Sequence, residues 1–173
     1  SKKEDKILRS ELLKSSKDRA ELTMIVDLER NDIGKVSKFG SVKVEKLFSI
    51  ENYMTVIHMV SKITGILKKN LNIVDLLKAT FPGGSITGAP KIRSMEIINE
   101  LETCSRNVYT GSIGYIDFNG NSDFNIAIRT IIMKDNNLIF NVGGGIVADS
   151  VPEDEYQETI HKGKAIIETL KNI

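Results

Sequence analysis

Two pairs of acidic residues have a spacing that could hold a metal ion. Asp18 and Glu21 lie three residues apart, as do Glu155 and Glu158, and each pair falls in a segment with helical periodicity. Residues at positions i and i+3 share one face of a helix, so each helix could direct two carboxylates toward one point. Four carboxylates would suit a hard cation such as Mg²⁺, which also takes substrate oxygens as ligands. By spacing alone, solvated acids near helix N-termini remain the more common explanation.

A basic residue, a histidine and a run of glycines add chemistry suited to anions. Arg129 lies in an apolar strand pattern, where its planar guanidinium could pair with a carboxylate or face solvent. His58 lies in a similar apolar stretch, where a buried structural histidine is as common as a catalytic one. Gly143–Gly145 could bring backbone N–H groups close to an anion, or form a bulge or tight turn. Together with a cation, these groups describe a site for a ligand rich in carboxylates.

The elements that must position these groups follow from periodicity. Helical spacing predicts helices over residues 4–14, 17–32, 73–80 and 152–170, and a further helix from Pro90 to Leu101. Gly34 and Gly40 follow the predicted C-terminal end of the second helix. Alternation predicts strands around Val42–Leu47 and at 112–118, 124–133 and 138–142, with turns at 119–121 and 135–137. Residues 53–66 favour a strand, with a helix as the alternative. Helices and hairpins alternate without a βαβ rhythm, which predicts an α+β fold with antiparallel pairing.

Composition limits the classes of function. The chain has 173 residues, of which 40% are hydrophobic and 27% charged, as in an ordinary globular domain. A net charge of +1 gives no electrostatic case for nucleic acid or a membrane surface, and no apolar run approaches the ~20 residues that cross a bilayer. The single cysteine, Cys104, excludes an internal disulfide, and with only two histidines a four-ligand zinc site is excluded too. We expect a cytoplasmic protein.

The glycine-rich segments do not match the common nucleotide-binding motifs, but they resemble segments of a known family. No Gly-Lys-Ser/Thr follows the loop at 82–91, so it is not a P-loop, and Gly143–Gly145 lacks the Gly-x-Gly-x-x-Gly spacing. Instead, Phe81–Lys91 resembles the F-P-G-G-S-I-T-G-A-P-K segment of the chorismate-binding family, and Glu21–Asp32 resembles its E-x-x-M-I-V-D-L-x-R-N-D segment. The resemblance continues in order over nearly the whole chain, through Gly111–Tyr115, Ile128–Thr130, Gly143–Ser150 and Glu155–Thr159.

The resemblance implies a fold and a metal site. In this family, which includes anthranilate synthase component I and isochorismate synthase, antiparallel strands form part of a larger β-sandwich with helices packed outside. Glu21 and Glu158 would be the main magnesium ligands, and Glu155 would support them directly or through water. Asp18 stands where many relatives carry Glu, which puts its reach to the metal in doubt. The magnesium would hold the ring carboxylate of chorismate.

The same resemblance implies roles around the substrate. Arg129 and Tyr109 would hold the enolpyruvyl carboxylate, and Lys162 would add positive charge. Ser85 and His58 would line the site near the ring, with His58 as the catalytic candidate. The backbone amides of three glycines would add hydrogen-bond donors: Gly143, Gly144 and Gly145.

The branch of the family is indicated by two short segments. Gly83–Thr87 and the triple glycine resemble the branch that aminates chorismate to 4-amino-4-deoxychorismate, with ammonia from a glutamine amidotransferase, for para-aminobenzoate and folate synthesis. The anthranilate branch is the alternative, and so is a module that binds chorismate or magnesium without turnover. The family's acid/base glutamate and the lysine of its P-I-K-G-T segment lie upstream of the segment that matches Glu21. We therefore expect residues 1–173 to be the C-terminal part of a chorismate-binding domain, inactive alone and prone to self-association through exposed apolar surface.

Overall fold

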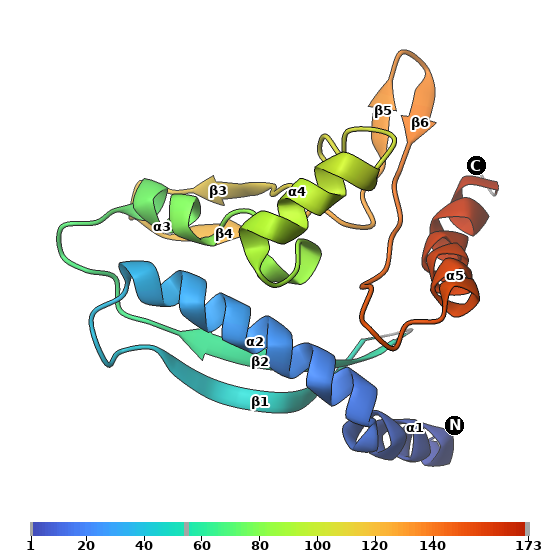
Figure 1. Cartoon of the computed structure of the whole chain (residues 1–173), viewed down its shortest axis with the longest axis horizontal. Coiled ribbons are helices and arrows are strands. Elements are labelled where there is room, and N and C mark those ends of the chain that lie inside the picture. Colours follow the sequence, from blue (N-terminus) through green and yellow to red (C-terminus); the bar gives the residue numbers. More distant parts are fainter. Residues whose placement is uncertain (1, 54–55, 172–173) are drawn as a thin grey trace. The chain divides into compact units, whose positions relative to one another are not determined.

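The computed structural model describes residues 2–53 and 56–171, and it confirms an α+β fold with antiparallel strands (Figure 1). The chain divides into two compact units, Ser1–Glu96 and Ile97–Ile173, and each is described by itself. The first unit contains α1 (Lys2–Lys14), α2 (Ser16–Val36), β1 (Lys43–Asn52), β2 (Ile57–Thr64), α3 (Ile73–Thr80) and the 3-10 turn η1 (Gly84–Ile86). α4 (Lys91–Leu101) spans the boundary, and β3 (Gly114–Ile116), β4 (Ser122–Phe124), β5 (Ile132–Lys134), β6 (Asn137–Ile139) and α5 (Pro152–Lys171) follow it.

α2 is the long helix of the first unit. The Ser15 side chain caps its N-terminus by accepting the Asp18 N–H at 3.2 Å, which satisfies one of the free donors of the first turn. The predicted end at residue 32 was wrong, because the helix passes through Gly34 and ends at Val36. The C-cap Ser37 N–H still reaches the Ile33 carbonyl, and Val36 is buried. The buried position of Val36 therefore extends the helix beyond the glycine.

β1 and β2 form an antiparallel hairpin beside α2 (Figure 1). The pairing runs from Lys43 opposite Thr64 to Asn52 opposite Ile57, so the strand predicted within residues 53–66 is confirmed over Ile57–Thr64. Residues 54–55 of that prediction lie outside the described residues. Branched side chains recur along β2, and these fit a half-buried pleated surface better than a helix.

The glycine-rich loop, residues 81–90, connects α3 to α4. A capping box between Asn72 and Asp75 starts α3, which covers the predicted residues 73–80. Within the loop, Gly84 is buried against α2, and a Cβ added there would lie 2.7 Å from the Leu28 Cβ. Only glycine allows this close approach of the loop backbone to the helix.

The second unit contains two short hairpins in place of the three longer strands that the sequence predicts. β3 pairs with β4 and β5 pairs with β6, so the predicted strand over 124–133 was wrong except at its two ends. The interruption falls at Arg129, whose backbone φ is 50°. Residues 125–131 all lie outside the strands, and Arg129 adopts left-handed backbone geometry among them. The tight turn of β5–β6 has positive φ at Asp135 and Asn136, as a two-residue hairpin turn requires.

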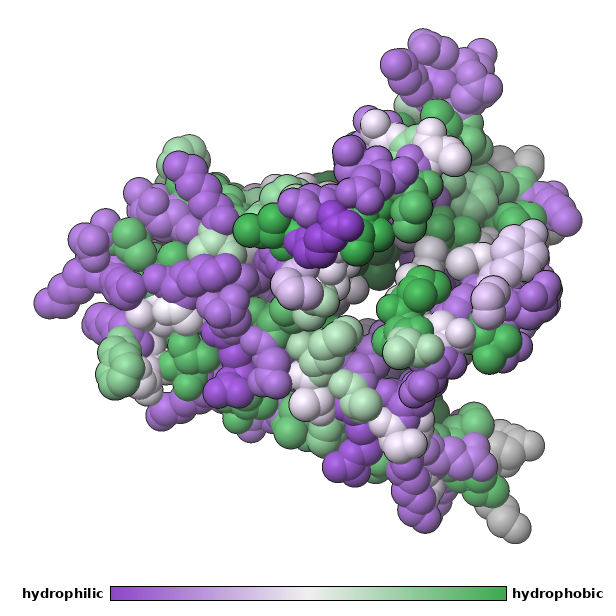
Figure 2. All heavy atoms as spheres, in the orientation of Figure 1, coloured by the Kyte–Doolittle hydropathy of each residue, from purple (hydrophilic) through white to green (hydrophobic). Residues whose placement is uncertain are grey.

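Apolar side chains remain exposed on both units (Figure 2). Among the described residues the buried apolar side chains are only Val26, Val36 and Ala127. On the hairpins of the second unit, Tyr115 is 58% exposed and Met133 is 75% exposed. The expected exposed apolar surface is therefore present, whereas self-association stays a prediction. No described helix combines the length and the apolar character that crossing a bilayer would demand.

A bidentate ion pair holds the segment that follows α4. The Arg106 guanidinium donates to the Glu102 carboxylate at 2.6–3.1 Å and lies 5.9 Å from the centre of the Tyr109 ring. These hydrogen bonds from Arg106 lower the pKa of Glu102 below its ordinary value, despite partial burial that acts in the opposite direction. The pair therefore fixes the chain just before Tyr109.

Replacing Gly84 should test the close approach of the glycine-rich loop to α2. Gly84→Ala is expected to destabilise the protein by about 1–3 kcal/mol, because the new methyl group overlaps Leu28. Gly34→Ala is the matched control, since its Cβ would meet no atom within 4 Å and alanine favours the helix. Urea unfolding of the two variants measures the difference, and equal stabilities would contradict the packing described.

The Glu102–Arg106 pair should make stability depend on pH in the acid range. Because the folded-state pKa of Glu102 is lowered, its contribution is complete above the ordinary glutamate pKa and is lost as the pH falls through the folded value. Glu102→Gln should therefore cost up to about 1 kcal/mol near neutrality and nothing in strong acid. Urea unfolding across this pH range, with Glu96→Gln as the control for loss of one charge, measures it. A Glu102→Gln deficit that persists unchanged into strong acid would count against the pair.

Candidate functional site

The two acids predicted on the first unit lie on α2 as expected. Asp18 and Glu21 fall in its first two turns, three residues apart, and both are exposed. Asp18 is also the residue whose N–H the Ser15 cap accepts. A carboxylate in the first turn is favoured by the helix dipole, which supports the structural explanation for Asp18 alongside the metal prediction.

His58 lies on β2 and is exposed, so the interpretation as a buried structural histidine was wrong. Its ring contacts Tyr53 edge-on, with 5.6 Å between the ring centres. The Tyr53 hydroxyl in turn donates to Glu51 at 2.8 Å, and this hydrogen bond raises the pKa of the phenol above its ordinary value. His58 is thus accessible to a ligand and oriented by an aromatic neighbour.

Ser85 lies in η1 and is also exposed. The residues around it are fixed by contacts of the loop with itself. The Thr87 hydroxyl donates to the Gly83 carbonyl at 2.9 Å, and the Gly88 N–H reaches the Gly84 carbonyl at 3.0 Å. A short, internally bonded turn therefore presents the serine.

In the second unit, Gly143 and Gly144 lie against predicted site residues, and Gly145 is exposed. A Cβ added to Gly143 would be 2.7 Å from the Tyr109 hydroxyl oxygen, and one added to Gly144 would be 3.3 Å from Glu155 Oε2 and 3.8 Å from Glu158 Oε1. The backbone after β6 is thus bordered by a phenol and two carboxylates. Glycine at 143 leaves room for the Tyr109 hydroxyl, which a side chain there would displace. These residues were predicted separately, and the fold of this unit brings them together.

The two acids of α5 have different surroundings. Glu155 is buried, and the Ser150 hydroxyl donates to its Oε1 at 2.5 Å. Glu158 is half-buried and pairs with Lys162 at 2.5 Å. Lys162 also donates to the Gly143 carbonyl at 3.2 Å, so one ammonium links α5 to the glycine backbone. Predicted residues of three kinds, acids, lysine and glycines, therefore meet at the start of α5.

Arg129 and Tyr109 occupy neighbouring segments of the same unit. The Thr110 N–H donates to the Ala127 carbonyl, and the Ala127 N–H donates to the Gly111 carbonyl, both at 2.9 Å. These bonds hold the chain around Tyr109 to the chain just before Arg129. Arg129 itself is exposed and lies at a bend, whereas the sequence predicted it within a strand.

The carboxylates have the chemistry for magnesium, and each unit supplies two of them. Oxygen donors in i, i+3 pairs suit a hard cation, and Glu155 and Glu158 both approach Gly144. Over residues 2–53 and 56–171, no three His, Cys, Asp or Glu side chains are gathered closely enough to hold a metal ion. Because Asp18 and Glu21 belong to one unit and Glu155 and Glu158 to the other, the shared site stays a prediction.

Several residues that organise this site were missed by sequence reasoning. Arg106 precedes Tyr109 by three residues, and its i, i+4 spacing from Glu102 was the available signal. Ser150 lies five residues before Glu155, at the start of the last helix, where a serine is a common partner for helix-terminal groups. Asp32 and Lys91 form an ion pair across 59 residues, and no local pattern indicates such a contact.

Comparisons with known proteins identify the family of this chain. Residues 1–168 match the family described as chorismate binding enzyme. The chain is 54% identical to aminodeoxychorismate synthase component 1 of Escherichia coli and 52% identical to anthranilate synthase component 1 of Aquifex aeolicus, each over 97% of this chain. It covers 37% and 34% of these relatives, so it spans about a third of their length.

A solved structure shares the fold. Anthranilate synthase component I from Streptococcus pneumoniae superposes with a TM-score of 0.88 at 49% identity, over 94% of this chain and 37% of that one. The similarity to two differently named synthases leaves the choice between their products open. The extent of the family match and the level of identity nevertheless show that this chain belongs to the family of chorismate binding enzymes.

Proposed function

We propose that the chain supplies the carboxylate-binding part of an aminodeoxychorismate synthase. The enzyme would replace the ring hydroxyl of chorismate by an amino group, releasing water and giving 4-amino-4-deoxychorismate. A glutamine amidotransferase partner would supply the ammonia. The observation that carries the proposal is the backbone at Gly143–Gly144, which lies against Tyr109, Glu155 and Glu158.

That backbone offers what a dicarboxylate substrate needs. Peptide groups without side chains allow a ligand to approach closely, and the Tyr109 hydroxyl beside Gly143 adds a donor. Arg129, exposed on an adjoining segment, would pair with the enolpyruvyl carboxylate through its planar fork. Lys162 holds the Gly143 carbonyl, and its charge would favour the anionic substrate.

Glu155 and Glu158 would repel that substrate unless a cation stood between them. We infer that magnesium does so, held by Glu158 and Glu21 with support from Glu155, while Asp18 lies one helical turn before Glu21. The ion would neutralise the acids and bind the ring carboxylate of chorismate. Lys162 balances part of the charge of Glu158 through the 2.5 Å ion pair. Ser85 and His58, both exposed, would face the ring, with His58 available for proton transfer.

The anthranilate reaction is the second candidate, supported by the 52% identity to the Aquifex aeolicus synthase. The segment Gly83–Thr87 favours the aminodeoxychorismate branch. The two reactions differ in one product that is easy to detect. Anthranilate formation removes the enolpyruvyl group as pyruvate, whereas amination to 4-amino-4-deoxychorismate retains it.

The product of the full-length protein tests the proposed function. With chorismate, magnesium and ammonia, we expect a product that retains the enolpyruvyl group, with no pyruvate released. Chromatography of the reaction, together with a coupled lactate dehydrogenase assay for pyruvate, separates the alternatives. Stoichiometric pyruvate with fluorescent anthranilate would replace the proposal by the second candidate, and binding of chorismate without turnover would indicate a binding module.

The magnesium concentration that activity requires should depend on Glu158. In the full-length enzyme, Glu158→Gln is expected to raise the magnesium concentration for half-maximal activity by about tenfold or more, because one charged ligand is lost. Glu168→Gln is the matched control, an exposed acid on the same helix whose carboxylate lies 3.8 Å from the Lys164 ammonium. Titration of activity with magnesium measures both. A similar magnesium requirement in the two variants would remove Glu158 from the metal site.

A further inference from the structure

Asp32 is the most completely buried large side chain among the described residues. It is 1% exposed and lies near the C-terminal end of α2. A carboxylate removed from water is stable only if its oxygens are paired with donors or cations. Asp32 meets this need with two lysines: Lys35 reaches Oδ1 at 2.9 Å, and Lys91 reaches Oδ2. The Lys35 side chain is 55% exposed and that of Lys91 only 18%, so the pair with Lys91 is the better shielded from solvent.

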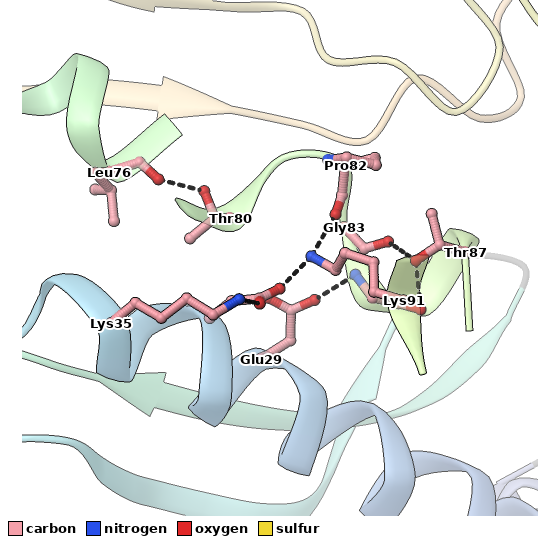
Figure 3. Close-up of polar contacts among 10 residues, drawn as sticks. Glu29, Lys35, Leu76, Thr80, Pro82, Gly83, Thr87 and Lys91 are labelled. Carbon is pink, nitrogen blue, oxygen red and sulfur yellow. Dashed lines mark hydrogen bonds and ion pairs between the residues drawn. The ribbon is translucent and has the colours of Figure 1, made fainter. Parts of the chain in front are cut away.

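Lys91 connects this buried acid to both ends of the glycine-rich loop (Figure 3). It is the first residue of α4, directly after the loop. Its ammonium also donates to the Pro82 carbonyl at 2.7 Å, near the start of the loop. One cation therefore brings the two ends of the loop together and ties them to α2.

Glu29 makes a second connection, one helical turn before Asp32. Its Oε1 accepts the Gly84 N–H at 3.1 Å, as Figure 3 shows beside Lys91. The same glycine lies so close to α2 that a Cβ there would meet Leu28. The loop is thus fixed to the helix by an ion pair and by a charged hydrogen bond, on the two sides of Ser85.

These contacts decide what the loop can offer to a ligand. The Gly84 N–H, which opens η1, already donates to a carboxylate, so it is not a donor for a substrate anion. Ser85, the next residue, is exposed and has its hydroxyl available on a backbone that is held on both sides. At this point the loop therefore offers the Ser85 side chain, and not the Gly84 amide, to a ligand.

We propose that Glu29 and Asp32 are positioning residues that set the orientation of Ser85 toward the substrate, Glu29 through Gly84 and Asp32 through Lys91. This inference rests on the proposed function, in which Ser85 lines the chorismate site. Neither acid touches the substrate. Their effect on the reaction passes through the loop, and it depends on the Ser85 hydroxyl.

A double-mutant cycle in the full-length enzyme tests this dependence. Glu29 is the position of choice because it is only half-buried, so its replacement leaves the buried Asp32–Lys91 pair intact. Glu29→Leu is expected to raise the KM for chorismate about tenfold with a smaller change in kcat, through loss of a charged hydrogen bond that orders the loop. In a Ser85→Ala background the same change should alter KM by less than about twofold, because the oriented group is gone.

Two further variants separate positioning from general stability. Glu29→Gln keeps an oxygen that can accept the Gly84 N–H, and it should restore most of the KM. Asp27→Asn is the matched control on the same helix, since Asp27 is exposed and pairs with Arg30 at 3.0 Å. It should leave both constants unchanged. An equal effect of Glu29→Leu with and without Ser85, or no rescue by Glu29→Gln, would overturn the proposal.

Hydrogen exchange gives a readout that does not need chorismate. In Glu29→Leu the Gly84 amide should exchange about tenfold faster than in the parent protein, and in Asp27→Asn it should not change. Unchanged exchange in Glu29→Leu would show that Glu29 does not hold the loop, which overturns the proposal. If the exchange result holds but the enzyme does not act on chorismate, the proposed function fails, and with it the role of the loop in orienting Ser85 toward that substrate.

Discussion

The main physical constraint on the second unit is the charge of two carboxylates on one face of α5. These carboxylates lie beside the glycine backbone at residues 143–144. Glu155 and Glu158 are drawn partly out of water next to Gly144, where their charges must be offset. Glu155 accepts a hydrogen bond from the Ser150 hydroxyl, and Glu158 forms an ion pair with Lys162. The same lysine holds the Gly143 carbonyl, so charge compensation and the path of the glycine backbone depend on each other. The proposed magnesium ion would add a further positive charge to this pair of acids.

The first unit also contains a buried acid whose charge must be offset. Its buried acid, Asp32, is neutralised within the protein by lysines, and this pairing fixes a loop. The acids on the exposed first turns of the same helix, Asp18 and Glu21, are left accessible to solvent. One helix thus carries a buried, paired carboxylate near its C-terminal end and exposed carboxylates near its N-terminal end.

Much of this organisation could be predicted from sequence because it is local. The amphipathic period of residues 152–170 and the apolar run at 73–80 gave helices close to α5 and α3. The strand predicted through Arg129 is interrupted over residues 125–131, where Arg129 adopts a left-handed backbone φ that periodicity does not detect. The acids, glycines and Lys162 were found as separate candidates, whereas the contacts of Glu29 and Asp32 join residues 55 and 59 positions apart and leave no local signal.

We propose that acids of the two helices α2 and α5 share one magnesium ion. The most direct measurement is anomalous scattering from crystals of the full-length enzyme grown with Mn²⁺, which prefers the same oxygen ligands. We predict a single strong peak within about 2.3 Å of carboxylate oxygens of both Glu21 and Glu158. A peak bound by only one of these helices, or placed away from both, would contradict the claim.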